Sequence, residues 1–398
     1  MMESPIRILM VSTEYPPMQG GVGRYTFNLT KELRRIGLQV YVACNEKGGG
    51  QFFGLSPTNI HNSDVLLHIV NETRPDIVHV QYEPGLYGLV LDPINPKKTN
   101  TNIESFYDKC EVPIVTTFHS AYTVKQWFSL GPTNTSSNGR NGNAAKLLLC
   151  RVGDYWKRLL NYRSFHDLNR NKVNNGQSGV VFSYYMAKMI DGEADRVEII
   201  YHGAEPAAFT RITKKEARTK FSLPQDGQIA LALGFRTATK GWDILEKMKV
   251  PKGWTIVVSS SENHYIKYDL QLRIGKNNNS IIILQNGFLS EFDLSILFYA
   301  SDAIILPYKV SSASGVMFDG LAHGLPFVAT DLEFFREFSA KGLGITVRRN
   351  PDAFSKGLVG LSSNYAGYRE SVGIFKKKLS WNAVAIQHAN LYKKRMGS

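Results

Sequence analysis

Four short segments of this chain carry glycine, histidine, hydroxyl or positively charged residues that together suit a phosphorylated ligand. They are residues 16–23, 118–120, 234–241 and 307–319. Gly20 and Gly21 would let backbone N–H groups approach a phosphate closely, and the start of a following helix adds a favourable dipole. Arg236 and Lys240 supply positive charge and hydrogen-bond donors that match a diphosphate.

The fourth segment would begin a helix, where Ser314, Gly315 and Val316 present backbone amides to a phosphate. Asp319 lies one turn further along and could accept hydrogen bonds from a hydroxylated ligand. Taken alone, each segment also has an ordinary explanation: a tight turn, a structural histidine at His119, an exposed basic turn, or a capped helix. The chemical interpretation therefore requires a fold that brings the segments together.

A predicted buried strand precedes each of the four segments. In the first half of the chain, apolar runs predict strands at residues 6–12, 40–43, 76–80, 113–118, 179–183 and 196–200. In the second half they predict strands at residues 228–234, 255–258, 280–284, 303–306 and 326–329. Helical patterns fit between the strands, so the sequence predicts two consecutive Rossmann-like α/β units. Parallel sheets bind ligands at the carboxyl ends of their strands, where each candidate segment lies.

Two polar stretches, residues 91–109 and 131–143, interrupt the first unit and have the composition of loops. Residues 144–169 form an amphipathic pattern whose basic side carries Lys157, Arg158 and Arg163. A helix packed on the first sheet explains this pattern, and a helix that contacts a membrane surface is the alternative.

The 398 residues carry a formal net charge of +13. This balance favours a polyanionic partner, such as nucleic acid, an anionic membrane or a phosphorylated small molecule, without choosing among them. Cys44, Cys110 and Cys150 form no CxxC pair, which favours a reducing compartment and argues against a structural zinc site. We find no signal-peptide pattern and no apolar run of about 18 residues. We therefore expect a cytoplasmic protein, soluble or peripheral at the inner membrane face.

Together these segments resemble the large family of retaining GT-B glycosyltransferases that includes sucrose synthases and bacterial and archaeal mannosyl- and glucosyltransferases. The likeness covers nearly the whole chain. It is carried by residues 12–22, 76–83, 116–119, 200–205, 234–241 and 314–319, and most specifically by residues 322–331. The tail at residues 379–385 looks like the family's terminal helix.

The resemblance implies a GT-B architecture, which is an α/β fold with two facing Rossmann-like domains and a central cleft. Residues 1–203 would form an N-terminal acceptor domain, and residues 204–379 a nucleotide-sugar donor domain. Residues 380–398 would form a helix that crosses back to the first domain.

The resemblance also implies residue roles. The catalytic residues would be His119, Lys240 and Asp319, which would contact the transferred sugar, the leaving phosphate and the ribose. Donor and diphosphate contacts would come from Gly20, Gly21, Arg236, Lys240, Ser314, Gly315, Val316 and Asp319. Acceptor or sugar contacts would come from Tyr82, Glu83, His202 and Ser311.

The chain departs from the family pattern at several positions of the donor site. The family often has two glutamates eight positions apart, and here those positions hold Ser311 and Asp319. The family's arginine, five residues before the lysine, falls on Phe235. His202 replaces an asparagine, and Glu337 resembles a family glutamate of less clear role. We interpret these departures as subfamily traits, with an inactive relative as the competing interpretation.

The expected reaction is transfer of a hexose from a nucleotide-diphosphate sugar, of the GDP-mannose or UDP-glucose type, with retention of configuration. No tightly bound cofactor and no obligatory metal are expected, because Lys240, Arg236 and backbone amides would balance the charge of the diphosphate. The acceptor is left open among a glycan, a lipid-linked molecule and a phosphorylated small molecule. The main alternative is a catalytically inactive sugar-nucleotide or glycan-binding protein of the same fold.

Two other classes of protein are disfavoured. A dinucleotide oxidoreductase would have a GxGxxG spacing after its first strand, and residues 20–23 lack it. Nucleic-acid binding is supported by net charge alone, so no nucleic-acid partner is expected.

Overall fold

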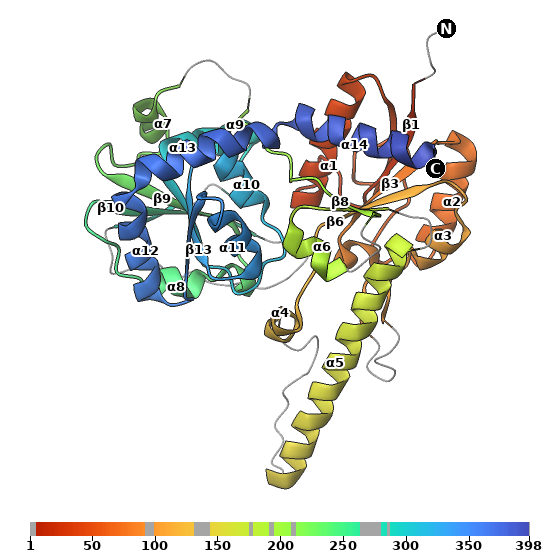
Figure 1. The fold of residues 1–398 in the computed structure, drawn as a ribbon, viewed down its shortest axis with the longest axis horizontal. Coiled ribbons are helices and arrows are strands. Elements are labelled where there is room, and N and C mark those ends of the chain that lie inside the picture. The colour runs from red at the N-terminus through yellow and green to blue at the C-terminus, as the bar shows by residue number, and fades with distance from the viewer. Residues whose placement is uncertain are drawn as a thin grey trace. The chain divides into compact units, whose positions relative to one another are not determined.

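The computed structural model describes residues 5–91, 99–130, 144–174, 178–190, 195–207, 212–262, 280–284 and 287–397, without the side chains of residues 144–152. The chain divides into two compact units (Figure 1). The first comprises residues 1–201 together with residues 384–398, and the second comprises residues 202–383. The loop predicted at residues 131–143 lies outside the described residues.

A parallel six-stranded sheet forms the centre of the first unit, with the strand order β2-β1-β3-β6-β7-β8. Its strands are β1 (Arg7–Val11), β2 (Gln39–Ala43), β3 (Ile77–Tyr82), β6 (Ile114–Phe118), β7 (Ser178–Val181) and β8 (Val197–Ile199). Strands β3 and β6 are buried at every residue, as expected for apolar central strands of a parallel sheet. The chain order reverses between β1 and β3, so the loops that follow these two strands flank a topological switch point.

The second unit is built on another parallel six-stranded sheet, in the order β11-β10-β9-β12-β13-β14. Its strands are β9 (Gln228–Phe235), β10 (Trp254–Ser261), β11 (Ile281–Leu284), β12 (Ala303–Leu306), β13 (Phe327–Thr330) and β14 (Gly344–Val347). Counted along the chain this is the order 3-2-1-4-5-6 of a Rossmann fold. Its switch point lies between β9 and β12, whose following loops are the third and fourth candidate segments.

Helices connect the strands in both units. In the first unit these are α1 (Gly21–Arg35), α2 (Asn62–Thr73), α3 (Glu104–Lys109), α4 (Val124–Ser129), α5 (Ala144–Asn174) and α6 (Tyr184–Ile190). In the second unit they are α7 (Lys214–Lys220), α8 (Trp242–Lys247), α9 (Glu291–Ala300), α10 (Gly315–Ala322), α11 (Glu333–Ser339), α12 (Pro351–Ser363) and α13 (Tyr365–Phe375).

The last helix, α14 (Trp381–Met396), begins in the second unit and belongs to the first unit from Val384 onward. A buried hydrogen bond anchors it there, because the Tyr392 hydroxyl lies 2.7 Å from His79 Nδ1 on β3. The His388 ring lies 5.3 Å from the His79 ring. Burial lowers the pKa of His79 well below its usual range and lowers that of His388 to about 4, so both rings are neutral at pH 7.

The longest helix, α5, is fixed to the first unit through its second half. Lys172 is almost fully buried, and its Nζ lies 2.7 Å and 2.5 Å from the two carboxylate oxygens of Glu104. The same ammonium lies over the rings of Tyr82 and Tyr107, at 4.7 Å and 5.1 Å from their centroids. Figure 1 shows the other half of α5 leading away from the sheet of its own unit.

The predicted α/β architecture is confirmed, and each predicted strand is part of one of the two sheets. Two expectations need correction. Residues 91–109 are not a plain loop, because they contain the two-residue strand β5 (Thr99–Asn100), paired with β4 (Val90–Leu91), and helix α3. The sequence prediction also missed the edge strand β14.

Candidate functional site

Two carboxylates lie at the switch point of the first sheet. Glu14 follows β1, is almost completely buried, and accepts a 2.8 Å hydrogen bond from the backbone N–H of Gly23 in the first turn of α1. A Cβ atom placed on Gly20 would lie 1.8 Å from Glu14 Oε1. The Glu14 carboxylate occupies the space that a side chain at position 20 would need, so only glycine fits there. At Gly21, by contrast, a Cβ would meet nothing within 4 Å.

The second carboxylate, Glu83, directly follows β3. Burial is the main reason that the pKa of Glu83 is raised to about 7. The Glu14 carboxylate adds to the rise, whereas hydrogen bonds from the Ser120 hydroxyl and the Gly85 amide oppose it. A carboxyl group with this pKa changes protonation state near neutral pH, which suits proton transfer or a switchable hydrogen bond.

His119 follows β6, the neighbour of β3 in the sheet. Its Nε2 lies 3.0 Å from Gln81 Oε1 and donates to it, and its backbone N–H donates to the carbonyl of Tyr82 at 2.9 Å. The ring packs edge-on against Tyr25 and Phe182, with centroids 5.2 Å and 5.3 Å away. The His119 ring is therefore fixed in one orientation.

Gln81 links His119 to the last helix. Its amide nitrogen donates to His79 Nε2 at 3.1 Å, and this acceptor role leaves the proton of the neutral His79 ring on Nδ1. Nδ1 then donates to the hydroxyl of Tyr392. A chain of buried hydrogen bonds thus runs from α14 through β3 to the candidate sugar-contacting histidine.

The Tyr82 side chain lies in the core of the first unit. Its ring has no exposed surface, stacks on Tyr87 with a centroid distance of 5.8 Å, and lies beneath the Lys172 ammonium. Alternating residues of a strand point to opposite faces, so Tyr82 enters the core while its neighbour Gln81 faces His119.

In the second unit, the loops after β9 and β12 are attached to each other. The backbone N–H of Lys309 donates to the carbonyl of Thr239 at 2.8 Å. Gly241 has a φ of +76°, and a Cβ there would lie 1.8 Å from the carbonyl oxygen of Pro307. Both the backbone conformation and the close approach require glycine at this position.

This attachment places Lys240 on the ring of Tyr308, with Nζ 4.0 Å from the centroid. Arg236 is held in a different way: its Nε donates to Ser260 Oγ at 3.2 Å, which ties the guanidinium to the end of β10. Phe235, the residue at the family's arginine position, stacks on Phe288. Lys240 is thus the cation that the two switch-point loops position together.

The N-terminus of α10 forms the other side of this switch point. Ser314 caps the helix, because its Oγ accepts from the backbone N–H of Met317 at 3.2 Å. The amides of Gly315 and Val316 are in the first turn, where an α-helix provides no partners of its own. His202 stacks on Phe318 of this helix, and a Cβ on Gly315 would lie 3.4 Å from His202 Nε2. The structure therefore brings His202 to the start of α10.

The remaining predicted residues have more enclosed positions. The Ser311 hydroxyl is buried and donates to the carbonyl of Ala313 at 3.0 Å. Asp319 is also buried, and its backbone carbonyl accepts from His323 Nδ1 at 2.7 Å. Glu337 lies on α11 and pairs with Lys341 at 3.6 Å.

Sequence reasoning missed Glu14 and Gln81 as residues of the candidate site. Glu14 lies three residues after β1 and Gln81 is the next-to-last residue of β3, so both are near the switch point that the strand order defines. That order was not assigned from the sequence.

Residues 19–208 match the family profile described as Glycosyltransferase Family 4. No curated protein matches the chain at a significant level. Among solved structures, sucrose-phosphate synthase from Thermosynechococcus elongatus is similar over 98% of each chain, with 14% identity and a TM-score of 0.66. Anabaena HepE in complex with UDP-glucose has a TM-score of 0.66 and 12% identity over 98% of this chain and 100% of that one. WaaG, a glycosyltransferase of lipopolysaccharide biosynthesis, has a TM-score of 0.60 and 13% identity over 97% and 99%.

The chain has the GT-B fold, and most of its first unit matches a glycosyltransferase family. The family match also includes the junction to the second unit, and the structural similarity extends over both units. No helix among the described residues is long and apolar enough to cross a membrane.

Proposed function

We propose that this protein is a glycosyltransferase that transfers a hexose from a nucleotide-diphosphate sugar to a hydroxylated acceptor, with retention of configuration at the sugar. One observation supports the donor assignment most strongly. The switch point of the second sheet combines the Lys240 ammonium, seated on Tyr308, with the amide-bearing N-terminus of α10. A cation beside free helix amides is the arrangement that a diphosphate requires.

The donor would be bound by the second unit. The Gly315 and Val316 amides would bind the diphosphate oxygens, and Lys240 would neutralise the charge that develops as the sugar leaves. Asp319 would accept hydrogen bonds from the ribose. HepE, a protein of similar fold, has been crystallised with UDP-glucose, which supports a donor of this class.

The acceptor would be bound by the first unit, where Glu83 and His119 follow adjacent strands of the sheet. We propose that the ionised Glu83 carboxylate accepts a hydrogen bond from the attacking hydroxyl and that His119 contacts the transferred sugar. The bond from the anomeric carbon to the phosphate oxygen breaks with its electron pair on the diphosphate. The acceptor oxygen bonds to the same face of that carbon, and its proton passes to the departing diphosphate.

No metal ion is required in this proposal, because Lys240 and the amides of α10 supply the positive charge at the leaving group. Arg236 would contribute at longer range from its position on Ser260. Transfer activity should therefore persist in the presence of EDTA.

The test is a screen of nucleotide sugars followed by turnover. A donor that binds the folded protein should raise the melting temperature, because binding to the native state stabilises it by mass action. UDP-glucose and GDP-mannose are the first candidates, and release of the nucleoside diphosphate with candidate acceptors measures the reaction. Failure of every nucleotide sugar to raise the melting temperature would contradict the proposal. Binding without turnover for any acceptor would support the inactive sugar-nucleotide-binding alternative.

We also propose that α5 makes peripheral contact with an anionic membrane surface. Tyr155 and Trp156 are about half exposed on this helix, Lys157 lies next to them, and the chain carries a net charge of +13. Aromatic rings beside cations suit an anionic lipid–water interface. Flotation with vesicles containing phosphatidylglycerol should recover the protein, and Tyr155→Ser together with Trp156→Ser should reduce recovery. Equal recovery with neutral vesicles, or with the double variant, would contradict this contact.

A further inference from the structure

The second unit contains a further pocket, at the sheet edge opposite the candidate donor loops. Its volume is about 410 Å³, which is within the range of small-molecule sites. Its walls come from the end of α9, the residues that follow α10, and α13. Ser301 and Leu325 line it two residues before β12 and β13 begin, so the pocket lies at the amino ends of these strands. The candidate diphosphate loops lie at their carboxyl ends.

The charge of this pocket is entirely positive. Ten described residues line it, and three of them, Lys214, Arg369 and Lys376, are cations, whereas none of the ten is Asp or Glu. They come from three different elements: α7, α13 and the short 3-10 turn Lys376–Leu379. Three cations converging on one concave surface without a lining carboxylate attract an anion.

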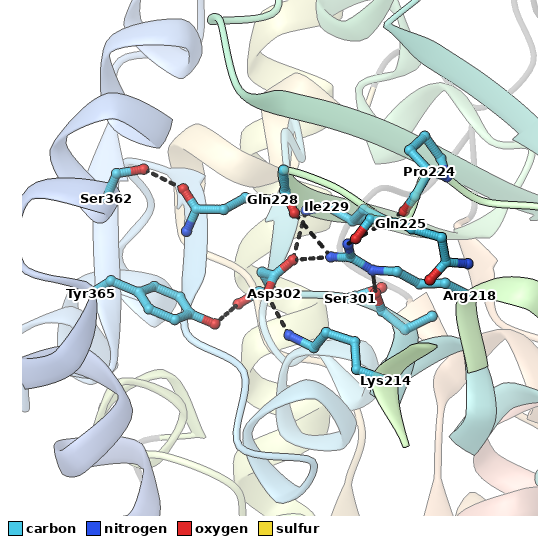
Figure 2. A network of polar contacts seen from close by, with 12 residues as sticks. Lys214, Arg218, Pro224, Gln225, Gln228, Ile229, Ser301, Asp302, Ser362 and Tyr365 are labelled. Atoms are coloured by element: carbon cyan, nitrogen blue, oxygen red, sulfur yellow. Dashed lines mark hydrogen bonds and ion pairs between the residues drawn. The ribbon is translucent and has the colours of Figure 1, made fainter. Parts of the chain in front are cut away.

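A carboxylate beside the pocket, that of Asp302, pairs with two cations. It accepts from the buried Arg218 at 2.7 Å and from the backbone N–H of Ile229 at 2.8 Å, and it also pairs with Lys214 (Figure 2). Arg218 is locked in place by further bonds to backbone carbonyls, including that of Gln225 at 2.8 Å. One negative charge therefore faces two positive charges, which leaves a net positive charge beside the pocket.

Arg369 is oriented toward the pocket by two neighbours. The Tyr365 hydroxyl donates to the backbone carbonyl of Asp302 at 2.9 Å, as Figure 2 shows, and it also interacts with the Arg369 guanidinium. Gly324 has a φ of +79°, and a Cβ there would lie 3.7 Å from Arg369 Nη1. The guanidinium thus lies next to a glycine, where no side chain covers it. Its planar set of N–H donors can bind two oxygens of one ligand.

We propose that this pocket is a second ligand site, which binds the phosphate group of a small phosphomonoester such as a sugar phosphate or a nucleoside monophosphate. Arg369 and Lys376 contact the phosphate oxygens, and Lys214 adds charge from the Asp302 side. The aromatic side chains of Tyr299 and Tyr365 line the same pocket and offer surfaces against which a sugar or base ring packs. This site does not depend on the proposed transfer reaction.

The test is calorimetric titration of the full-length protein at low salt, with saturating UDP present to occupy the donor site. Glucose 6-phosphate, AMP and inorganic phosphate are the probes, and glucose and adenosine are the uncharged controls. We expect one phosphate ligand per chain and no binding of the uncharged controls. Removing one charged contact should weaken binding by about tenfold, so Arg369→Gln and Lys376→Glu should each show this loss. Lys377→Glu is the matched control, because this exposed neighbour does not line the pocket.

The relative affinities of the probes show whether the site binds a phosphomonoester or free inorganic phosphate. Tighter binding of glucose 6-phosphate or AMP than of inorganic phosphate assigns the site to that phosphomonoester. Binding of inorganic phosphate alone overturns the phosphomonoester assignment. The site itself is overturned if no probe binds at millimolar concentration, or if Lys377→Glu weakens binding as much as Lys376→Glu. Thermal denaturation of each variant checks that the loss does not come from unfolding.

Discussion

The two carboxylates at the first switch point differ in their surroundings, and this difference assigns them different roles. Glu14 is buried and accepts a hydrogen bond from the first turn of α1, which makes it a structural acceptor. Glu83 is partly exposed, and desolvation together with the Glu14 carboxylate raises its pKa to about 7. The protonation state of Glu83 therefore changes near neutral pH.

This assignment predicts a pH dependence that belongs to one residue. If acceptor binding needs the ionised Glu83, KM for the acceptor should fall as pH rises through about 7. Glu83→Gln should abolish that dependence while donor affinity stays the same. Initial rates measured against acceptor concentration between pH 6 and pH 8 test it, and an unchanged profile in the variant would exclude Glu83 as the titrating group.

A stability measurement provides an independent control for Glu83. Its folded-state pKa is raised above the ordinary value of 4.5, so its contribution to stability is present below that value and is lost as pH rises through about 7. Glu83→Gln removes the titrating carboxyl group and therefore this loss of stability at high pH. The variant should therefore be at least as stable as the wild type at pH 8, as measured by urea denaturation.

Lys240 should be the most sensitive residue of the second unit. Lys240→Ala removes the cation at the proposed leaving group, and loss of such a contact lowers kcat by about 10²–10³-fold. Lys247→Ala, an exposed lysine at the end of α8, is the matched control. Equal kcat values for the wild type and Lys240→Ala would remove Lys240 from the mechanism.

Residue type and strand order placed the candidate diphosphate residues on two neighbouring loops, but the sequence did not predict side-chain direction. Lys240 and the N-terminus of α10 follow adjacent strands at a switch point, and a hydrogen bond from Lys309 to Thr239 joins the two loops. The Arg236 side chain bonds to Ser260, and the Tyr82 ring is buried in the core. The Ser311 hydroxyl bonds to the neighbouring backbone. These directions depend on tertiary neighbours, which the local sequence does not specify.

At the level of elements, apolar runs were sufficient to locate the strands at the centre of each sheet. The edge strand β14 was missed because it is short and three of its four residues are only half-buried. Helix α3 was missed because its sequence, ESFYDK, carries only two buried residues and follows a polar stretch. Such segments are stabilised mainly by the surfaces on which they pack, so their local pattern is weak.

The attachment of α14 to β3 can be tested by deleting a single oxygen. Tyr392→Phe removes the partner of the buried His79 Nδ1–H, and an unsatisfied buried donor lowers the free energy of unfolding by about 1–3 kcal/mol. Tyr155→Phe, at an exposed tyrosine of the same unit, should change it little. Urea denaturation measures both variants. Equal stabilities would show that the hydrogen bond does not anchor the helix.

At the level of the whole molecule, each unit has its own sheet, and the contacts that we propose for the nucleotide and its leaving diphosphate lie in the second. Hydrogen exchange with and without UDP should therefore show slower exchange at residues 234–241 and 314–317. Residues 7–82 of the first unit should show a smaller change. If protection instead concentrates in the first unit, the nucleotide is bound there and the donor assignment is wrong.

The division of α14 between the two units has a consequence for synthesis on the ribosome. Domains generally fold in the order in which they emerge. Here the first unit still lacks Tyr392, the hydrogen-bonding partner of His79, until the entire second unit has been translated. A nascent chain halted before residue 384 should therefore be digested by protease within its first 201 residues faster than the released full-length protein.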